Sequence, residues 1–95
     1  MDKSQIKQLK ALAHKLKPIV TVGQHGMKDS INDELAIALD FHQLVKIKIN
    51  VGDHSVRDAL ITEFTNVHQA QLIQKIGNIA VLYRKNPQKN DLLSI

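Results

Sequence analysis

The chain contains no cysteine and no tryptophan, and only 3% of its residues are aromatic. Without cysteine, disulfide frameworks, thiolate zinc sites, iron–sulfur clusters and cysteine nucleophiles are excluded. So few aromatic rings exclude a stacking platform like that on the sheet of an RNA recognition motif. Because a chain without cysteine needs no oxidising compartment, we expect a cytoplasmic protein.

Long apolar runs and a signal peptide are also missing. Apolar runs such as residues 79–83 reach five residues, whereas a membrane-spanning helix needs about 18 or more. The first residues lead directly into a lysine-rich segment and lack the apolar centre of a signal peptide. We therefore expect a soluble protein that is not exported and has no membrane partner.

The overall composition of the chain is typical of one folded domain. The 95 residues are 43% hydrophobic and 23% charged, close to the averages of globular proteins. Domains most often have about 100–150 residues, so a second domain is excluded. We assign residues 1–85 to a single domain and residues 86–95 to a polar C-terminal tail that contains Pro87.

The net charge of +4 is distributed unevenly along the chain. Residues 1–28 contain six lysines and one acid, and residues 64–95 contain four basic residues and one acid. Residues 29–63 contain seven acids and three basic residues. If the two ends of the chain lie together, the molecule has a basic face and an acidic face, and the basic face favours a polyanionic partner.

Helical and extended patterns alternate along the chain. Apolar spacing predicts helices over about residues 4–17, 28–41 and 55–65. Apolar or alternating segments predict strands over residues 19–22, 44–51, 70–76 and 79–84. Strand–helix–strand units require parallel neighbours, and the final two strands form a hairpin at Gly77-Asn78. The predicted fold is a single α-β-α-β-α-β-β domain of the α/β (α+β) class with a four-stranded mixed sheet.

Local signals also predict how the first and third helices begin and which residues they bury. Ser4 and Ser55 are the expected N-caps, because a serine side chain can accept a hydrogen bond from the first free amides. The third helix is expected to bury an apolar stripe that consists of Val56, Ala59, Leu60 and Phe64, or Val67 in place of Phe64.

The first predicted helix carries a basic stripe beside its apolar one. At about 100° per residue, the basic side chains fall together on one arc. The members of this stripe are Lys3, Lys7, Lys10, His14 and Lys17. They are candidates for binding an anionic partner, although lysines that merely solvate an exposed helix face are the alternative that the helix alone favours. For His14 we favour a half-buried, hydrogen-bonded position over direct contact with a partner.

Gly23-Gln24-His25-Gly26 is a Gly-x-x-Gly pattern between a predicted strand and a predicted helix. Two glycines permit a tight turn, and the next helix directs free N–H groups and the positive end of its dipole to the loop, which suits a phosphate. KH domains clamp a nucleotide backbone with such a loop. Many such patterns are ordinary turns, but the flanking strand and helix favour phosphate binding here. Lys28 follows the loop; His25 either contacts the ligand or is simply exposed.

The other polar residues do not indicate catalysis or a metal site. The five histidines lie 11 to 17 residues apart, with no i,i+4 pair. The chain has no catalytic-triad order, Walker sequence or Rossmann fingerprint. We therefore predict no enzymatic activity, no metal, no cofactor and no small-molecule substrate. Arg84 ends the last predicted strand as an exposed cation and is a candidate for extending the basic face.

Motifs spread over nearly the whole chain resemble those of one family. They are Leu9, Ala13-His14, Leu16-Lys17-Pro18, Val22-Gly23 with Gly26, Ala38-Leu39, His42-Gln43-Leu44-Val45-Lys46-Ile47, Ile76-Gly77 and Leu82-Tyr83-Arg84. In this order they resemble the CRM domain, the chloroplast RNA splicing and ribosome maturation module. Its stand-alone bacterial members are the YhbY-type proteins.

The resemblance implies a fold similar to the C-terminal domain of translation initiation factor three and an RNA-binding role on precursors of the large ribosomal subunit. Together with the basic stripe, it implies that RNA binds at Gly23, Gln24, His25, Gly26, Lys28, Lys3, Lys7, Lys10, His14, Lys17 and Arg84. Many relatives have a basic residue inside the loop, so Gln24 and His25 leave phosphate binding to the backbone and Lys28. The function expected is ribosome assembly by binding ribosomal RNA. The alternative is a protein-interaction adaptor whose acidic middle segment docks a basic ribosomal protein.

Overall fold

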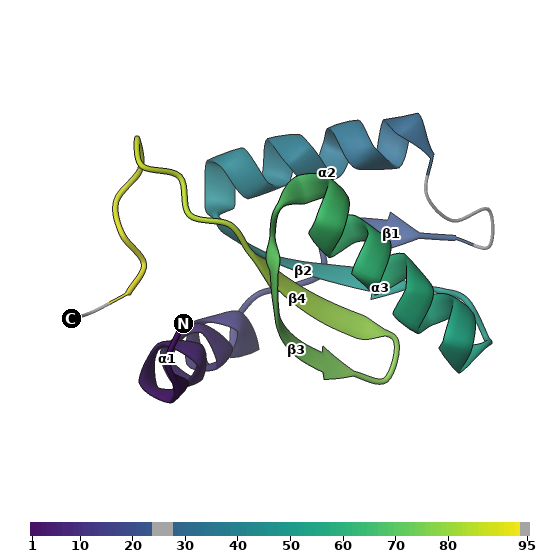
Figure 1. The fold of residues 1–95 in the computed structure, drawn as a ribbon, viewed down its shortest axis with the longest axis horizontal. Helices are drawn as coiled ribbons and strands as arrows, with labels where there is room; N and C mark the ends of the chain where they lie inside the picture. The colour runs from purple at the N-terminus through teal and green to yellow at the C-terminus, as the bar shows by residue number, and fades with distance from the viewer. Residues whose placement is uncertain (24–27, 94–95) are drawn as a thin grey trace.

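A computed structural model describes residues 1–23 and 28–93 of the chain. Within these residues the elements are α1 (Lys3–His14), β1 (Val20–Val22), α2 (Asp29–His42), β2 (Leu44–Ile49), α3 (His54–His68), β3 (Gln71–Ile76) and β4 (Ile79–Tyr83). The strands form one sheet in the order β1-β2-β4-β3 (Figure 1). The β1–β2 pair is parallel, and the other two pairs are antiparallel. The predicted element order and mixed four-stranded sheet are confirmed.

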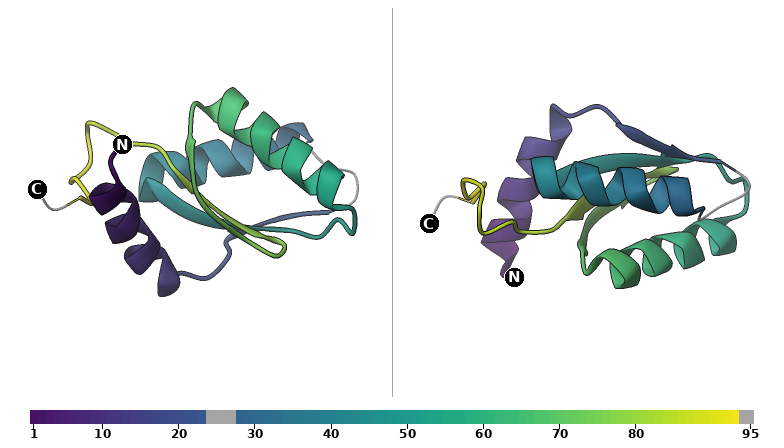
Figure 2. Two further views of the ribbon diagram at one scale, coloured as in Figure 1. Left: turned by 60° about the horizontal axis from the view of Figure 1, so that its bottom comes forward. Right: turned by 90° about the horizontal axis from the view of Figure 1, so that it is seen from above.

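The helices cover both faces of this sheet (Figure 2). α2 and α3 pack on one face, where Leu35, Leu39 and Phe64 are fully buried against β1, β2 and β4. α1 packs on the other face, where Leu9 and Ala13 form a second, smaller cluster with residues of β2, β3 and β4. Burial of each large apolar side chain stabilises the fold by roughly 1.5–3 kcal/mol. The two clusters together hold three layers in place.

The helix N-caps differ from those expected from the sequence. The Asp2 carboxylate accepts a hydrogen bond from the Gln5 backbone N–H at 2.8 Å, and the Gln5 side-chain oxygen accepts one from the Asp2 N–H at 3.1 Å. In α3 the Asp53 carboxylate accepts hydrogen bonds from the N–H groups of the residues two and three positions later. Ser4 and Ser55 are therefore wrong as N-caps, because an aspartate lies just before each and its negative charge also suits the helix dipole.

The buried face of α3 also differs from the expectation. Ile61, Phe64 and His68 are buried, whereas Val56 is 45% exposed and Ala59 is exposed. The helix extends to His68, three residues beyond the predicted end, and its C-terminal half is the part that packs in the sheet cluster. The predicted stripe is therefore confirmed at Leu60 and Phe64 and wrong at Val56 and Ala59. Ile61, Phe64 and His68 recur at the spacing of one helix face, and Ala59 points away from that face.

The segment after β4 packs back onto the domain. The Gln43 amide donates a hydrogen bond to the Asn90 carbonyl oxygen at 2.8 Å, and the Asn86 N–H donates one to the Gln43 side-chain oxygen at 3.0 Å. Leu92 and Leu93 pack against the α1 cluster. Residues 86–93 thus lie against the end of α2 and the sheet, near the N-terminus of the chain (Figure 1). Among the helices of the described segments, none has the length and apolar character needed to cross a membrane.

Candidate functional site

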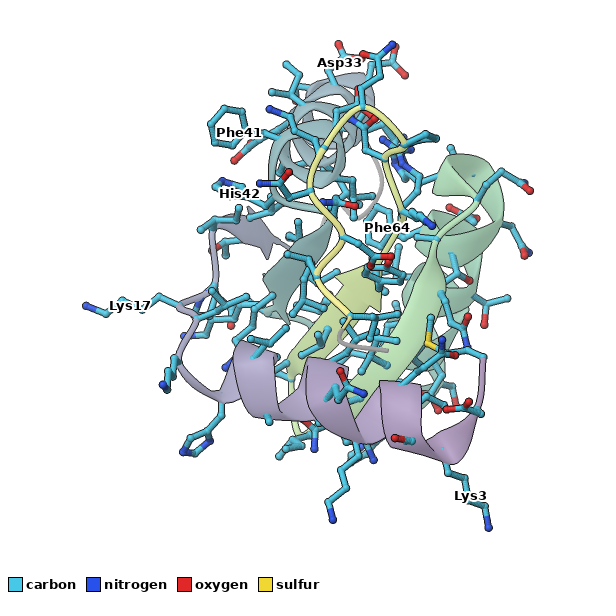
Figure 3. The ribbon with its side chains drawn as sticks, turned by 90° about the vertical axis from the view of Figure 1, so that its left-hand side faces the viewer. Lys3, Lys17, Asp33, Phe41, His42 and Phe64 are labelled. Atoms are coloured by element: carbon cyan, nitrogen blue, oxygen red, sulfur yellow. The ribbon has the colours of Figure 1, made fainter. Side chains whose placement is uncertain are left out.

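Lysines gather on the side of the sheet that α1 covers. Lys3, Lys7, Lys10 and Lys17 are all exposed, and Lys3 and Lys17 project outward at opposite ends of the α1 segment (Figure 3). The ion pairs within residues 1–23 and 28–93 are Lys75–Asp58, Arg84–Asp40 and Lys85–Asp91. None of them uses a lysine of the α1 segment. These ammonium groups are therefore accessible to an external anion.

The sheet adds two lysines that sequence reasoning did not assign to the site. Along β2, Val45, Ile47 and Ile49 are buried against α2 and α3. The alternating residues, Lys46 and Lys48, must therefore point to the α1 side. Lys48 is exposed and Lys46 is half-buried. The alternating pattern in the sequence predicts that these lysines lie on the more solvent-exposed face of the strand. It does not show which helix packs on that face.

Part of this sheet face is open. Strand register aligns Thr21, Lys48, Ile79 and Ile76 as one row across the four strands. Thr21 and Lys48 are exposed, and Ile76 is 62% exposed. α1 therefore leaves the row next to the carboxyl end of β1 uncovered. We call one surface the basic face: it consists of Lys3, Lys7, Lys10 and Lys17 from α1 and the chain just after it, together with Lys46, Lys48 and Thr21 of the sheet.

The structure does not bring α1 next to the residues that flank the Gly-x-x-Gly pattern. α1 lies towards one end of the long axis, and β1 ends and α2 begins towards the other end in every view (Figures 1 and 2), along the 39 Å extent of the domain. Gln24, His25 and Gly26 lie outside the described residues. Gly23 and Lys28, which flank them, are exposed. The predicted residues thus form two groups, with the open part of the sheet between them.

The start of α2 retains the features that suggested a phosphate site. Lys28 is the N-cap residue and makes no side-chain capping hydrogen bond, unlike Asp2 and Asp53 at the other two helices. A Cβ atom added to Gly23 would meet no heavy atom within 4 Å. The carboxyl end of a parallel strand followed by a helix N-terminus is a usual place for anions.

His14 and Arg84 differ from the positions expected for them. His14 is exposed at the last residue of α1, because the neighbouring Ala13 occupies the buried face instead. The expectation of a half-buried His14 is therefore wrong. The Arg84 guanidinium donates hydrogen bonds to the carbonyls of His68 and Ala36 at 3.0 and 3.2 Å and pairs with Asp40 at 2.7 Å. Its side chain is only 24% exposed, so it links α2 to α3 instead of extending the basic face.

His68 is a buried structural residue that the sequence did not single out. Its Nε2 lies 2.8 Å from the Asn32 side-chain oxygen. Since that oxygen only accepts, Nε2 carries the proton. Burial and the nearby Arg84 charge lower the pKa of His68 below its ordinary value of 6.5. In residues 1–23 and 28–93, no group of three or more histidine, aspartate or glutamate side chains is placed to hold a metal ion.

Acidic side chains gather on the opposite side of the molecule. Asp29, Asp33, Glu34 and Asp40 of α2 are exposed, as are Asp58 and Glu63 of α3. Asp33 and Lys3 project from opposite sides in Figure 3. Because α2 and α3 share one face of the sheet and α1 covers the other, the charge segments of the sequence become separate faces.

Comparison with known proteins identifies relatives of the whole chain. The family model described as the CRS1 / YhbY (CRM) domain matches residues 1–84. A Pseudomonas aeruginosa protein named as a probable RNA-binding protein is 37% identical over 94 residues, which cover 99% of this chain and 90% of the relative. A Haemophilus influenzae protein named RNA-binding protein is 35% identical over 80 residues, covering 84% of this chain and 81% of the relative.

A solved structure supports the fold independently. The solution structure of a hypothetical protein from Staphylococcus aureus superposes with a TM-score of 0.84. The match covers 100% of this chain and 98% of the other, at 22% sequence identity. At this identity the likeness concerns the fold alone.

The position of His68 predicts a pH dependence of stability. Because the folded state lowers the pKa of His68, the unfolded chain binds its proton more readily, so stability is full above about pH 6.5 and decreases as the pH falls below it. His68→Gln should flatten this part of the profile while keeping an N–H donor for Asn32. The measurement is urea unfolding between pH 5.5 and 7.5, with His14→Gln as the exposed-histidine control. A profile unchanged in His68→Gln would contradict the assignment.

Proposed function

Because the chain belongs to the CRS1 / YhbY (CRM) domain family, we propose that it is an RNA-binding protein that uses the basic face. The observation that carries this proposal is the gathering of exposed lysines from α1 and β2 on one side of the sheet, outside every ion pair of the described residues. The names of the two bacterial relatives support it. The absence of a catalytic constellation in the sequence supports a role in binding without catalysis.

The chemistry of the face suits the phosphate backbone of RNA. Lysine ammonium groups neutralise phosphates and release condensed counterions, which gives affinity without sequence readout. Their spread over α1 and β2 matches an extended ligand better than a single anion. Specificity in this arrangement comes from the shape of a folded RNA more than from the edges of its bases.

The Gly-x-x-Gly segment supplies a second contact in this proposal. β1 ends and α2 begins towards the far end of the domain from α1, so an RNA that touches both groups crosses the open row of the sheet at Thr21 and Lys48. The amides at the start of α2 and the Lys28 ammonium then hold a phosphate. In this arrangement Lys3, Lys7, Lys10, His14 and Lys17 bind one part of the RNA and the loop binds another.

A folded RNA of that extent fits a role on ribosomal RNA. We propose that the protein acts in the cytoplasm as an assembly factor on precursors of the large ribosomal subunit. The resemblance of the sequence to the ribosome maturation module supports this finer assignment. A charged surface that reads shape suits a folded precursor RNA better than a short single-stranded message.

A second candidate function is docking of a basic ribosomal protein on the acidic side. One observation favours it: Ile37 and Phe41 on α2 are 70% and 64% exposed, close to the exposed carboxylates of Asp33 and Asp40. Apolar side chains framed by acids suit a basic amphipathic partner. The two functions use opposite sides of the sheet and are separable by experiment.

The α1 lysines predict how RNA affinity depends on salt. Lys7→Glu combined with Lys10→Glu should weaken binding for every RNA sequence. It should also flatten the plot of log affinity against log salt by about 0.7 for each lost phosphate contact on single-stranded RNA. Fluorescence anisotropy at several salt concentrations measures both effects.

The control is Lys75→Glu combined with Lys89→Glu, which changes the net charge equally on the other side of the molecule. Lys75 pairs with Asp58 of α3, and Lys89 lies over the Phe41 ring of α2 at 4.6 Å. If both double variants change the slope equally, overall charge and not the basic face governs binding.

The start of α2 gives a separate prediction. Gly23→Asp introduces a negative charge where a side chain has free space, so RNA retention should fall about tenfold or more while the melting temperature changes little. Gly23→Ala is the neutral control and should bind normally. Equal losses in both variants would indicate that the backbone, and not the charge, is responsible. The measurements are a filter-binding assay and thermal unfolding.

The ribosomal assignment is tested by sedimentation of the protein with cell extract. We expect co-migration with large-subunit precursors, and release of the protein after RNase treatment or at high salt. The double variant Lys7→Glu/Lys10→Glu should remain at the top of the gradient. Association that survives RNase and the double variant would instead support docking of a protein on the acidic side.

A further inference from the structure

The strongest unassigned feature is an apolar cavity of about 280 Å³ between α1, the first residues of β2 and the C-terminal segment. Its walls include Leu12, Leu16 and Ile19 from the chain around the end of α1, together with Leu44 and Leu92. Leu12, Leu16 and Ile19 are 43%, 39% and 46% exposed. Single exposed leucines are common on protein surfaces, but three around one cavity leave apolar walls in contact with water.

The rim of this cavity is basic. Lys17, His42 and Lys46 complete its lining together with Val45, and none of the described residues that line it is acidic. Figure 3 shows Lys17 and His42 on the same side of the molecule, one from the segment after α1 and one from the end of α2. The His42 ring also contacts the Phe41 ring edge to face, with centroids 4.8 Å apart. The lining therefore combines apolar side chains, two lysine ammonium groups and the His42 imidazole.

The cavity is continuous with the basic face, because Lys17 and Lys46 belong to both. We infer that it accepts one unstacked nucleobase of the RNA held on that face. Apolar walls suit the two faces of a base, and ammonium and imidazole groups at the rim suit its polar edge and the adjoining phosphates. The basic rim disfavours a basic peptide, and the small volume suits one planar ring better than a helix. This inference rests on the proposed function. It adds a contact to a base of the RNA, whereas the lysines contact the RNA backbone.

The test compares two single-stranded RNA oligonucleotides of equal length and charge, one with bases and one with abasic riboses. Backbone amides and the isoleucine and leucine methyl groups of the isotope-labelled protein are followed by NMR. We expect both oligonucleotides to shift signals of the basic face, and only the base-containing one to produce ring-current shifts at Leu16 and Ile19. Identical methyl shifts with both oligonucleotides would overturn the inference.

Affinity measurements give an independent readout. Leu16→Ser should weaken binding of the base-containing oligonucleotide about tenfold and leave its salt slope unchanged, because no phosphate contact is lost. Binding of the abasic oligonucleotide should not change. The matched control is Leu72→Ser, whose side chain is 38% exposed and lies elsewhere, beside Asp58 and Lys75. Ile19→Ser replaces the test variant if Leu16→Ser melts early.

The outcomes separate this inference from the proposed function. Salt-dependent binding of both oligonucleotides with no effect of Leu16→Ser would leave the basic face intact and overturn the base site. An equal loss on both oligonucleotides would also overturn it, since the cavity would then act through the fold. Failure of the wild-type protein to bind either oligonucleotide, while it binds a folded RNA, would overturn the base site alone; failure to bind the folded RNA as well would overturn both proposals.

Discussion

The alternation along β2 is the constraint on which the rest of the structure depends. β2 pairs with both β1 and β4, and its residues Val45, Ile47 and Ile49 anchor the α2 and α3 layer. The same period of two places Lys46 and Lys48 on the opposite face, beside α1. A shift of one residue would bury the lysines and expose the core. One strand thus fixes the hydrophobic core and the charge of the surface together.

The layered arrangement converts a linear charge pattern into two faces. The acidic middle of the chain forms α2 and α3 on one side of the sheet, and the lysine-rich beginning forms α1 on the other. A polyanion is attracted to one side and repelled from the other, so a modest net charge of +4 still orients it. The apolar cavity beside Leu16 and Lys46 offers such a ligand a contact to a nucleobase in addition to the contacts to its phosphates.

Much of the fold was predictable because its signals are local. Helical spacing, β-branched runs and the Gly77 turn, with φ of 56°, are set within a few residues of each other. Both N-caps were misassigned by two residues because aspartate and serine compete for the same role, as at Asp53 and Ser55. The α1 lysines were assigned to the site from the sequence. The two sheet lysines, Lys46 and Lys48, were not, because the sequence does not tell which face of the sheet α1 covers.

By itself the sequence determined the order of the elements and the segregation of charge along the chain. These follow from periodicity and composition, which act over short distances. Only the tertiary structure decided that Arg84 binds the carbonyls of Ala36 and His68, and that α1 lies far from the start of α2. It also decided that Leu16 borders a cavity. Each of these depends on contacts between segments distant in the chain, which no local pattern encodes.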